Sequence, residues 1–417
     1  MAITDDSPTQ SHRESDWQAI LHQALVDQSE RMISIRRELH QHPELSGNER
    51  ETSLLLYQLL GDAGFAVQLG PEGCGLIADW PADEPVENGR FAIRADLDAL
   101  RIEDCKDVDY RSQVPGVMHA CGHDAHSAIL IGTLMALKQV QTSETLKFPC
   151  AFRGIFQPAE ETSSGARQMI GNEALEDVRA IIALHVDPSR DVGKVGIRSG
   201  VLTSNCDDFQ IMVYGRGGHA ARPHETHDPV AASAQLINAL YNYIPRVTNS
   251  QDAIVLTICQ IDAGDSANVI PEVVRLRGTL RTLDAEIRQK TLDHISRIAR
   301  GIAEATETRI EVRYGLTCPS VINDESVTNL LRNCAQEIVG KDGIDEIELA
   351  SMGSEDFSLY LQQIPGVMVR LGCRGESVGG SSLHSPDFDI DERALHIGAE
   401  LMSLSAIRWW EQFTSLT

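Results

Sequence analysis

The sequence lacks an excess of basic residues. It carries 36 Lys and Arg against 61 Asp and Glu, which gives a formal net charge of −25 over 417 residues. Nucleic-acid binding requires a positively charged stripe, and anionic membrane surfaces attract clustered Lys and Arg. The composition therefore argues against nucleic acid and membrane as partners.

The sequence also lacks a long apolar run. The nearest candidate, residues 128–137, is too short to span a bilayer, and residues 1–18 have neither the basic nor the apolar region of a signal peptide. The nine cysteines are an odd number scattered over a large chain, which is not the pattern of a disulfide framework. We expect a cytoplasmic protein in which residues 1–15 form a flexible tail.

The length and the apolar pattern predict an α/β protein of two domains. Short apolar runs at 75–80, 91–95, 148–156 and 180–186 alternate with helical stretches. Ser46 and Glu49 have the spacing of a capping box, which would open a helix that ends at Gly64. We expect a central, mostly parallel sheet flanked by helices.

The pattern of apolar and polar residues changes in the middle of the chain. Phe209, Ile211 and Val213 alternate with polar residues, as in a half-buried strand, and Asp228-Pro229 is a typical helix start. The elements expected over residues 200–315 follow the order βαββαβ, that of a ferredoxin-like domain. Candidate ligands lie on both sides of this unit, so we expect it to be inserted into one domain made of residues 16–199 and 316–417.

The strongest chemical signal is the segment 119–126, His-Ala-Cys-Gly-His-Asp-Ala-His. In an extended segment Cys121 and His123 would point the same way, and Gly122 would let the backbone approach closely. Thiolate and imidazole suit zinc or a neighbouring transition metal. The alternative is a buried thiol beside histidines that cap a helix, which is the commoner arrangement for an isolated Cys-x-His.

Three further segments carry candidate ligands. Glu160 and Glu161 follow an apolar strand, His185 ends another, and His384 lies in a loop before a proline. Each has an ordinary alternative: exposed carboxylates at a helix start, a buried core histidine, and a plain turn. Their occurrence together favours a metal site.

These motifs resemble those of the aminoacylase and carboxypeptidase-type metallo-amidohydrolases. The similarity is greatest to the branch of hippurate hydrolases, auxin-amino-acid conjugate hydrolases and N-acyl-diaminopimelate deacetylases. It spans nearly the whole chain, from Arg-Glu-Leu-His-Gln-His-Pro-Glu at 37–44 through Arg-Ala-Asp-Leu-Asp-Ala-Leu at 94–100 to His-Ser-Pro at 384–386. Cys121 marks the branch, because other branches have a carboxylate at that position.

The resemblance implies one or two divalent ions per subunit, either zinc or manganese, with nickel and cobalt as further options. It assigns their ligands to the following five residues: Cys121, His123, Glu161, His185 and His384. It makes Glu160 the general base, which takes a proton from a metal-activated water and passes it to the leaving nitrogen. Asp98 becomes the carboxylate that orients a ligand, with Asp96 a weaker candidate.

The resemblance also assigns roles to the inserted domain, as a lid and as the interface of a homodimer. His219 would stabilise the oxyanion, either within its own subunit or from the partner subunit, while Asn268 and Arg281 would hold the substrate's carboxylate. A loop at 353–357 would support the metal site. The family's glycine-rich run after the paired glutamates is replaced here by Thr-Ser-Ser-Gly at 162–165.

The sequence thus predicts a metal-dependent amidohydrolase acting on N-acyl amino acids. Three alternatives stay open: a dipeptidase or carboxypeptidase of the same family, a non-catalytic metal-binding homologue, and a thiol hydrolase with Cys121 as nucleophile. A dipeptidase would need a group that recognises a free amine. A thiol hydrolase would be insensitive to chelators.

Overall fold

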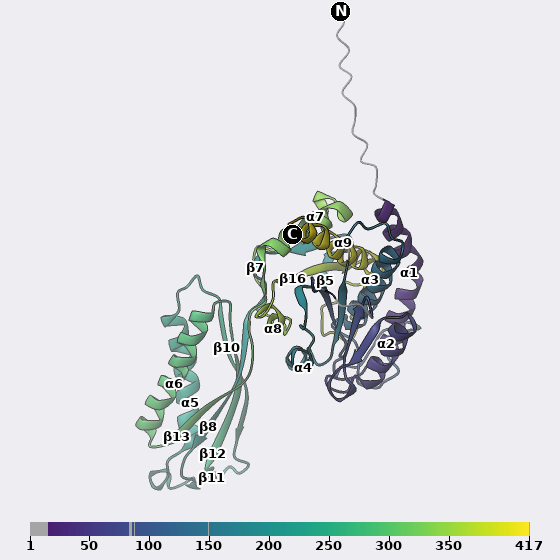
Figure 1. The fold of residues 1–417 in the computed structure, drawn as a ribbon. Helices are drawn as coiled ribbons and strands as arrows, with labels where there is room; N and C mark the ends of the chain where they lie inside the picture. The colour runs from purple at the N-terminus through teal and green to yellow at the C-terminus, as the bar shows by residue number, and fades with distance from the viewer. Residues whose placement is uncertain (1–15, 83–85, 87, 149, 417) are drawn as a thin grey trace, which may run out of the picture.

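The computed structural model describes residues 16–82, 86, 88–148 and 150–416, so the expected tail at 1–15 lies outside the described residues. Figure 1 shows two lobes. We call the one that carries the larger sheet the large lobe, and the one that carries the smaller sheet the small lobe. Among the described helices, none combines the length and the hydropathy that crossing a membrane requires.

The large lobe is built on a mixed sheet of eight strands. From edge to edge the strands are β1 (Ala66–Leu69), β2 (Leu76–Trp80), β4 (Phe152–Gln157), β3 (Arg90–Asp96), β5 (Val178–Asp191), β16 (Gly366–Arg374), β6 (Val195–Ile197) and β15 (Ile344–Glu346). The central strands β4, β3, β5 and β16 run parallel. The β1–β2, β2–β4 and β16–β6 pairs are antiparallel. The predicted helix-flanked sheet is confirmed, with antiparallel pairs toward its edges.

Helices cover both faces of this sheet, and alternate residues of each strand face the two sides. On one side the main core is shared with α1 (Asp16–Gln41), α2 (Arg50–Asp62), α3 (His123–Thr142), α7 (Glu325–Val339) and α9 (Arg393–Leu416). The opposite side packs against α4 (Gly165–Gly171) and α8 (Ser358–Leu361). Burial on both faces explains why the central strands are continuous apolar runs in the sequence.

The small lobe has the predicted βαββαβ order. Its elements are β8 (Asn205–Tyr214), α5 (Pro229–Val247), β10 (Ile254–Ala263), β12 (Val273–Thr282), α6 (Ala285–Thr306) and β13 (Arg309–Cys318). The antiparallel sheet has the order β10-β12-β8-β13, and both helices pack on one face over a separate core. Asp228 caps α5 as predicted, because its Oδ1 accepts from the amides of Val230 and Ala231.

Short elements complete the chain. Two small strand pairs join β7 (Gly200–Val201) to β14 (Ile322–Asn323) and β9 (Gly218–His219) to β11 (Val269–Ile270). Single 3₁₀ turns are η1 (Pro71–Gly73), η2 (Pro223–Glu225) and η3 (Lys341–Gly343).

The predicted capping box is wrong. The α2 helix begins at Arg50 without a side-chain cap, and Ser46 Oγ instead donates to Asp98 Oδ2 at 2.7 Å. Glu49 Oε1 accepts from the backbone amides of Gly47 (2.9 Å) and Ala159 (2.8 Å). Both side chains therefore hold loops that carry candidate site residues, with Ser46 contacting Asp98 and Glu49 contacting Ala159, in place of capping the helix.

Candidate metal centre

Cys121 and His123 lie at a bend that leads into α3. The expected extended segment is not found, since His123 is already the first helical residue. Gly122 has a φ of 86°, in the left-handed region, and a Cβ there would lie 2.3 Å from Cγ2 of Val186. The bend still lets Cys121 and His123 converge with His185, with one ligand atom of each within 4.8 Å of the others.

The orientation of both histidines is fixed through Nδ1. Nδ1 of His123 lies 2.9 Å from the carbonyl of Asp98 and 3.1 Å from its Oδ1. Nδ1 of His185 donates to the carbonyl of Val186 at 2.7 Å. With Nδ1 of each ring engaged by an oxygen, Nε2 is the nitrogen left to bind a metal. Nε2 of His123 is buried and makes no hydrogen bond, while Nε2 of His185 lies 3.4 Å from Sγ of Cys121.

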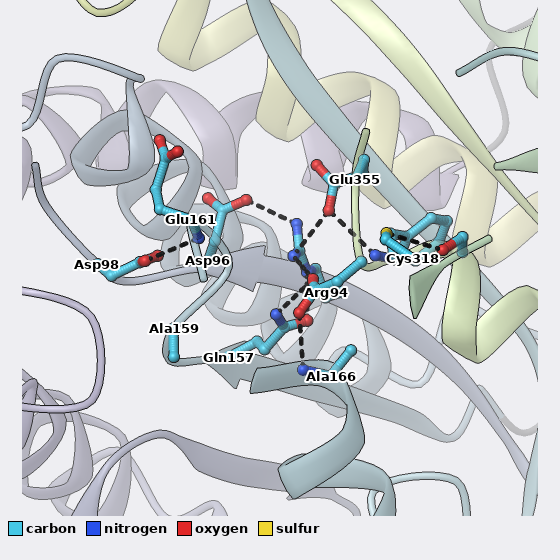
Figure 2. Close-up of polar contacts among 12 residues, drawn as sticks. Arg94, Asp96, Asp98, Gln157, Ala159, Glu161, Ala166, Cys318 and Glu355 are labelled. Carbon is cyan, nitrogen blue, oxygen red and sulfur yellow. Dashed lines mark hydrogen bonds and ion pairs between the residues drawn. The ribbon is translucent and has the colours of Figure 1, made fainter. Parts of the chain in front are cut away.

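Asp98 also fixes the loop that carries the paired glutamates. Its Oδ2 accepts from the amide of Glu161 at 3.0 Å, a contact drawn in Figure 2. Although burial opposes ionisation, hydrogen bonds from His123 and Ser46 hold the pKa of Asp98 below its usual range. Asp98 thus contacts the side chain of one candidate ligand, His123, and the backbone amide of another, Glu161.

His384 completes the set from the other end of the chain. Its amide donates to the carbonyl of Ala120 at 2.8 Å, and its Nε2 lies 3.1 Å from Oε1 of Glu161. Cys121, Glu161 and His384 form one group of potential ligands, and Cys121, His123 and His185 form another. The two groups share Cys121 and together contain all five candidate ligands, which would hold divalent metal ions. Sulfur, imidazole and carboxylate donors suit zinc and its neighbours.

His126 belongs to a third group, with Asp96 and His123, but both of its ring nitrogens are occupied. Nδ1 lies 2.6 Å from Oδ1 of Asp96, and Nε2 accepts from the amide of Val186 at 2.9 Å. His126 therefore supports the site and does not offer a ligand. Asp96 holds His126, whereas Asp98 holds His123, so the two aspartates have separate tasks.

Glu160 lies beside these ligands as a carboxylate with 9% exposure. Its side chain is near those of Glu355 and Asp356, and one oxygen of each lies within 4.8 Å of the others. Burial, followed by repulsion from Glu355 and Asp356, raises the pKa of Glu160 well above its usual value. A carboxylate with a raised pKa accepts a proton readily, which a general base requires.

Arg94 organises the carboxylates beneath Glu160. Its guanidinium donates to Asp96 (2.6 Å), Glu355 (3.0 Å), Asp356 (3.1 Å) and the side-chain carbonyl of Gln157 (2.9 Å). Figure 2 shows these contacts converging on Arg94. Sequence reasoning identified the loop at 353–357 as a support but missed Arg94 as its partner, because the two are far apart in the chain.

Cys121, Glu161, His185 and His384 line a cavity of about 430 Å³ that reaches the small lobe. Its wall includes Arg281 of β12, whose Nη1 donates to the carbonyl of Met352 at 3.0 Å. It also includes Arg370 of β16, which sequence reasoning missed. The available signal was a lone charge within the apolar run Val-Met-Val-Arg-Leu at 367–371.

The structure does not bring His219 or Asn268 to this cavity. Both lie near the β9–β11 pair, and Figure 1 shows β11 at the end of the small lobe that is remote from the large lobe. His219 is exposed, with its Nδ1 accepting from the amide of Ala221, and Ser266 Oγ donates to the Asn268 side chain. Within one chain, only Arg281 of the three small-lobe candidates lines the site.

The protonation of the ligands depends strongly on burial. Burial raises the pKa of Cys121 to about 12. Burial, with the nearby charge of Arg370, lowers the pKa of His185 well below its usual value. A hydrogen bond to Glu161 raises the pKa of His384. Cys121 is therefore a thiol at neutral pH until a cation displaces its proton.

Comparison with known proteins gives consistent matches over most of the chain. Residues 92–408 match the model of peptidase family M20/M25/M40. A probable hydrolase of Synechocystis is 39% identical over 91% of this chain and 96% of its own length. An N-acetylcysteine deacetylase of Bacillus subtilis is 37% identical over 90% of this chain and 96% of its own.

Two crystal structures are similar over nearly their full length. A putative aminohydrolase of methicillin-resistant Staphylococcus aureus superposes with a TM-score of 0.85 at 30% identity, over 94% of this chain and 99% of that one. A Bacillus subtilis protein described as a dinuclear metal-binding peptidase of the M20 family has a TM-score of 0.77 at 34% identity, over 93% and 99%.

Proposed function

The chain belongs to peptidase family M20/M25/M40, a family of metal-dependent peptidases and amidohydrolases, and within that class we propose that it hydrolyses the amide bond of N-acyl amino acids. The observation that carries this proposal is a single cavity lined by Glu160, Arg281 and four of the five candidate metal ligands. A base, a cation site and a carboxylate-binding group are the parts that this reaction needs.

The metal ligands we propose are Cys121, His123, Glu161, His185 and His384, for one or two ions of zinc, manganese, nickel or cobalt. The free Nε2 of His123 and the fixed Nδ1 of His185 support this set. When bound, the metal polarises the amide carbonyl and makes water acidic enough to react near neutral pH.

Glu160 is proposed as the general base. It takes a proton from the attacking water and delivers it to the nitrogen of the departing amino acid. Its burial and the neighbouring charges of Glu355 and Asp356 favour proton uptake. Asp98 keeps His123 in the tautomer that leaves Nε2 free.

Arg281 is proposed to bind the substrate's carboxylate. Nη1 of its guanidinium donates to the carbonyl of Met352, and its other nitrogens can donate to an anion. The carboxylates that line the same cavity are Glu160, Glu161 and Glu355. Two of them have the roles given above, and Arg94 pairs with Glu355. This leaves no carboxylate on the described wall for a free ammonium group, which favours an acylated substrate over a dipeptide.

His219 and Asn268 are proposed to act in the cavity of a partner subunit. In that arrangement the residue range 200–315 is both a lid and the interface of a homodimer, inserted into a catalytic domain of 16–199 and 316–417. Two features of the small lobe support an interface. The strand β10 is at the edge of its sheet with Val255 and Ile261 exposed, and α5 exposes Tyr241 and Tyr243.

The proposed setting is the cytoplasm, and the nine free thiols support it. Burial raises the pKa of Cys121 to about 12, so its thiol is a poor nucleophile without a metal. This favours the metal mechanism over a thiol hydrolase.

The test is hydrolysis by metal-loaded protein of N-acetyl-methionine, hippurate, N-acetyl-diaminopimelate and the dipeptide glycyl-methionine. The proposal predicts turnover of at least one acylated amino acid and a kcat/KM for glycyl-methionine at least about tenfold below it. Preference for glycyl-methionine would indicate a dipeptidase. Metal binding without turnover of any substrate would indicate a non-catalytic homologue.

A further inference from the structure

Arg370 is a half-buried cation beside the metal site. It lies in register with His185 on the adjacent parallel strand, and its side chain lines the same cavity as Cys121 and His384. Among the described residues, no hydrogen bond or ion pair of its guanidinium is found, although the side chain is half-buried.

Three nearby arginines have protein partners. Arg94 is paired with three carboxylates, Arg190 with Asp187 and Asp345, and Arg281 with the carbonyl of Met352. A partly desolvated guanidinium without an anion is costly, and divalent cations nearby increase that cost. The guanidinium of Arg370 is therefore available to bind a negatively charged group of a ligand.

The space around Arg370 is suited to a ligand. A second cavity of about 310 Å³ adjoins the metal cavity, and Ser351, Arg370 and Leu383 line both. The remaining wall of the second cavity has the aliphatic residues Val186, Leu202, Ile347 and Leu349 and the ion pair between Asp187 and Arg190. A short carbon chain leading from the metal site into this side cavity would pass Arg370.

We propose that Arg370 recognises a second carboxylate on the substrate, so that the preferred substrates are N-acyl amino acids with two carboxylates. Arg281 takes the α-carboxylate, and Arg370 takes the other through a bidentate pair. The second carboxylate belongs either to the side chain of the amino acid or to a dicarboxylic acyl group. The inference rests on the proposed function, because it concerns the substrate of the same site.

The test uses two pairs of substrates that differ in one charge. N-acetylglutamate and N-acetylglutamine place the charge on the amino acid, whereas N-succinyl-methionine and its terminal amide place it on the acyl group. In at least one pair, the wild-type kcat/KM is expected to be about tenfold or more higher for the acidic member. Arg370→Met should bring that ratio close to 1, and Arg370→Lys should retain part of it.

Arg374→Met is the matched control. Arg374 is at the exposed end of the same strand, where it pairs with Asp191, so its removal changes the net charge equally and should keep the ratio.

A second readout is the Kd of the preferred acidic substrate, measured by calorimetry on the Glu160→Gln protein. Arg370→Met should weaken it about tenfold or more at equal metal content.

A wild-type preference for the neutral member of both pairs would overturn the inference, as would a ratio unaffected by Arg370→Met. Loss of metal in Arg370→Met would also overturn it, because Arg370 would then serve the metal site. Failure of the proposed function would give a different result from failure of this inference. Metal-loaded wild-type protein would then hydrolyse neither N-acetylglutamine nor any other N-acyl amino acid.

Discussion

At the scale of single residues, Glu160 is the side chain on which turnover should depend most. Glu160→Gln keeps the size of the side chain and deletes only the proton acceptor. We expect the rate of amide hydrolysis to fall by roughly 10²-fold or more, with metal content and melting temperature close to those of the parent. Steady-state kinetics with metal analysis of both proteins checks this, and near-normal turnover would mean that another group is the base.

Cys121 makes metal binding dependent on pH. Burial raises the pKa of its thiol to about 12, so the metal-free protein holds this proton at neutral pH and must release it on binding. Affinity should therefore rise with pH, by up to about tenfold per unit for each proton released. Calorimetry in buffers of different ionisation enthalpy measures the number of protons released when the metal binds.

Cys121→Ser is the variant that isolates this effect. A hydroxyl is a poorer ligand than a thiolate for zinc and its neighbours, so the variant should bind metal more weakly, release fewer protons and regain part of its activity in excess metal. If it binds metal like the parent, Cys121 is only a buried thiol.

The candidate ligands could be named from the sequence, because Cys121 and His123 share one short motif and the paired glutamates form another. The tautomers could not, since they depend on carbonyls such as those of Asp98 and Val186. Arg370 was missed for a similar reason: its place at the site follows from the register between β16 and β5.

At the scale of elements, the loop between β4 and α4 carries both glutamates and is pinned at its two ends by Asp356. Oδ1 of Asp356 accepts from the side chain of Gln157 at 2.7 Å, and Oδ2 accepts from the amide of Ala166 at 3.0 Å. One buried carboxylate thus sets the path of the chain between Gln157 and Ala166, including Glu160 and Glu161.

Asp356→Asn should loosen this loop. An amide group offers one acceptor in place of two, so a buried hydrogen bond is lost at a cost of about 1–3 kcal/mol. We expect a lower melting temperature and a lower kcat, with KM changed less. Asp345→Asn, an exposed carboxylate on β15, is the control that should leave both unchanged. Equal kcat for Asp356→Asn and the parent would show that the loop does not need this anchor.

The order of helices and strands followed from periodicity and turn residues, but two local predictions failed. The capping box was wrong because Ser46 and Glu49 bind Asp98 and Ala159, far along the chain. The extended segment around Cys121 was wrong because Gly122 turns the chain directly into α3. In both cases tertiary contacts, invisible in a short window of sequence, decided the local structure.

At the scale of the whole molecule, one chain does not bring every proposed group to the cavity. Arg281 lines the cavity, whereas His219 is exposed on the small lobe, in the β9–β11 strand pair, which is remote from the large lobe. A second subunit that supplies His219 would complete the site.

Mixing two inactive proteins tests this arrangement. Glu160→Gln lacks the base and His219→Ala lacks the oxyanion donor, but a mixed dimer has one cavity with both. After subunit exchange at equal amounts, random pairing predicts recovery of about a quarter of the wild-type activity. Each variant mixed with itself is the control. No recovery, with exchange demonstrated by differently tagged subunits, would mean that His219 does not act across the interface.

Hydrolysis of an N-acyl amino acid before and after removal of the metal tests most directly whether this is a metal-dependent amidohydrolase. We expect activity to fall in step with metal content on treatment with a chelator and to return when zinc, manganese, nickel or cobalt is restored, while Glu160→Gln stays inactive throughout. Metal-free protein that hydrolyses the substrate at the original rate would contradict the metal mechanism.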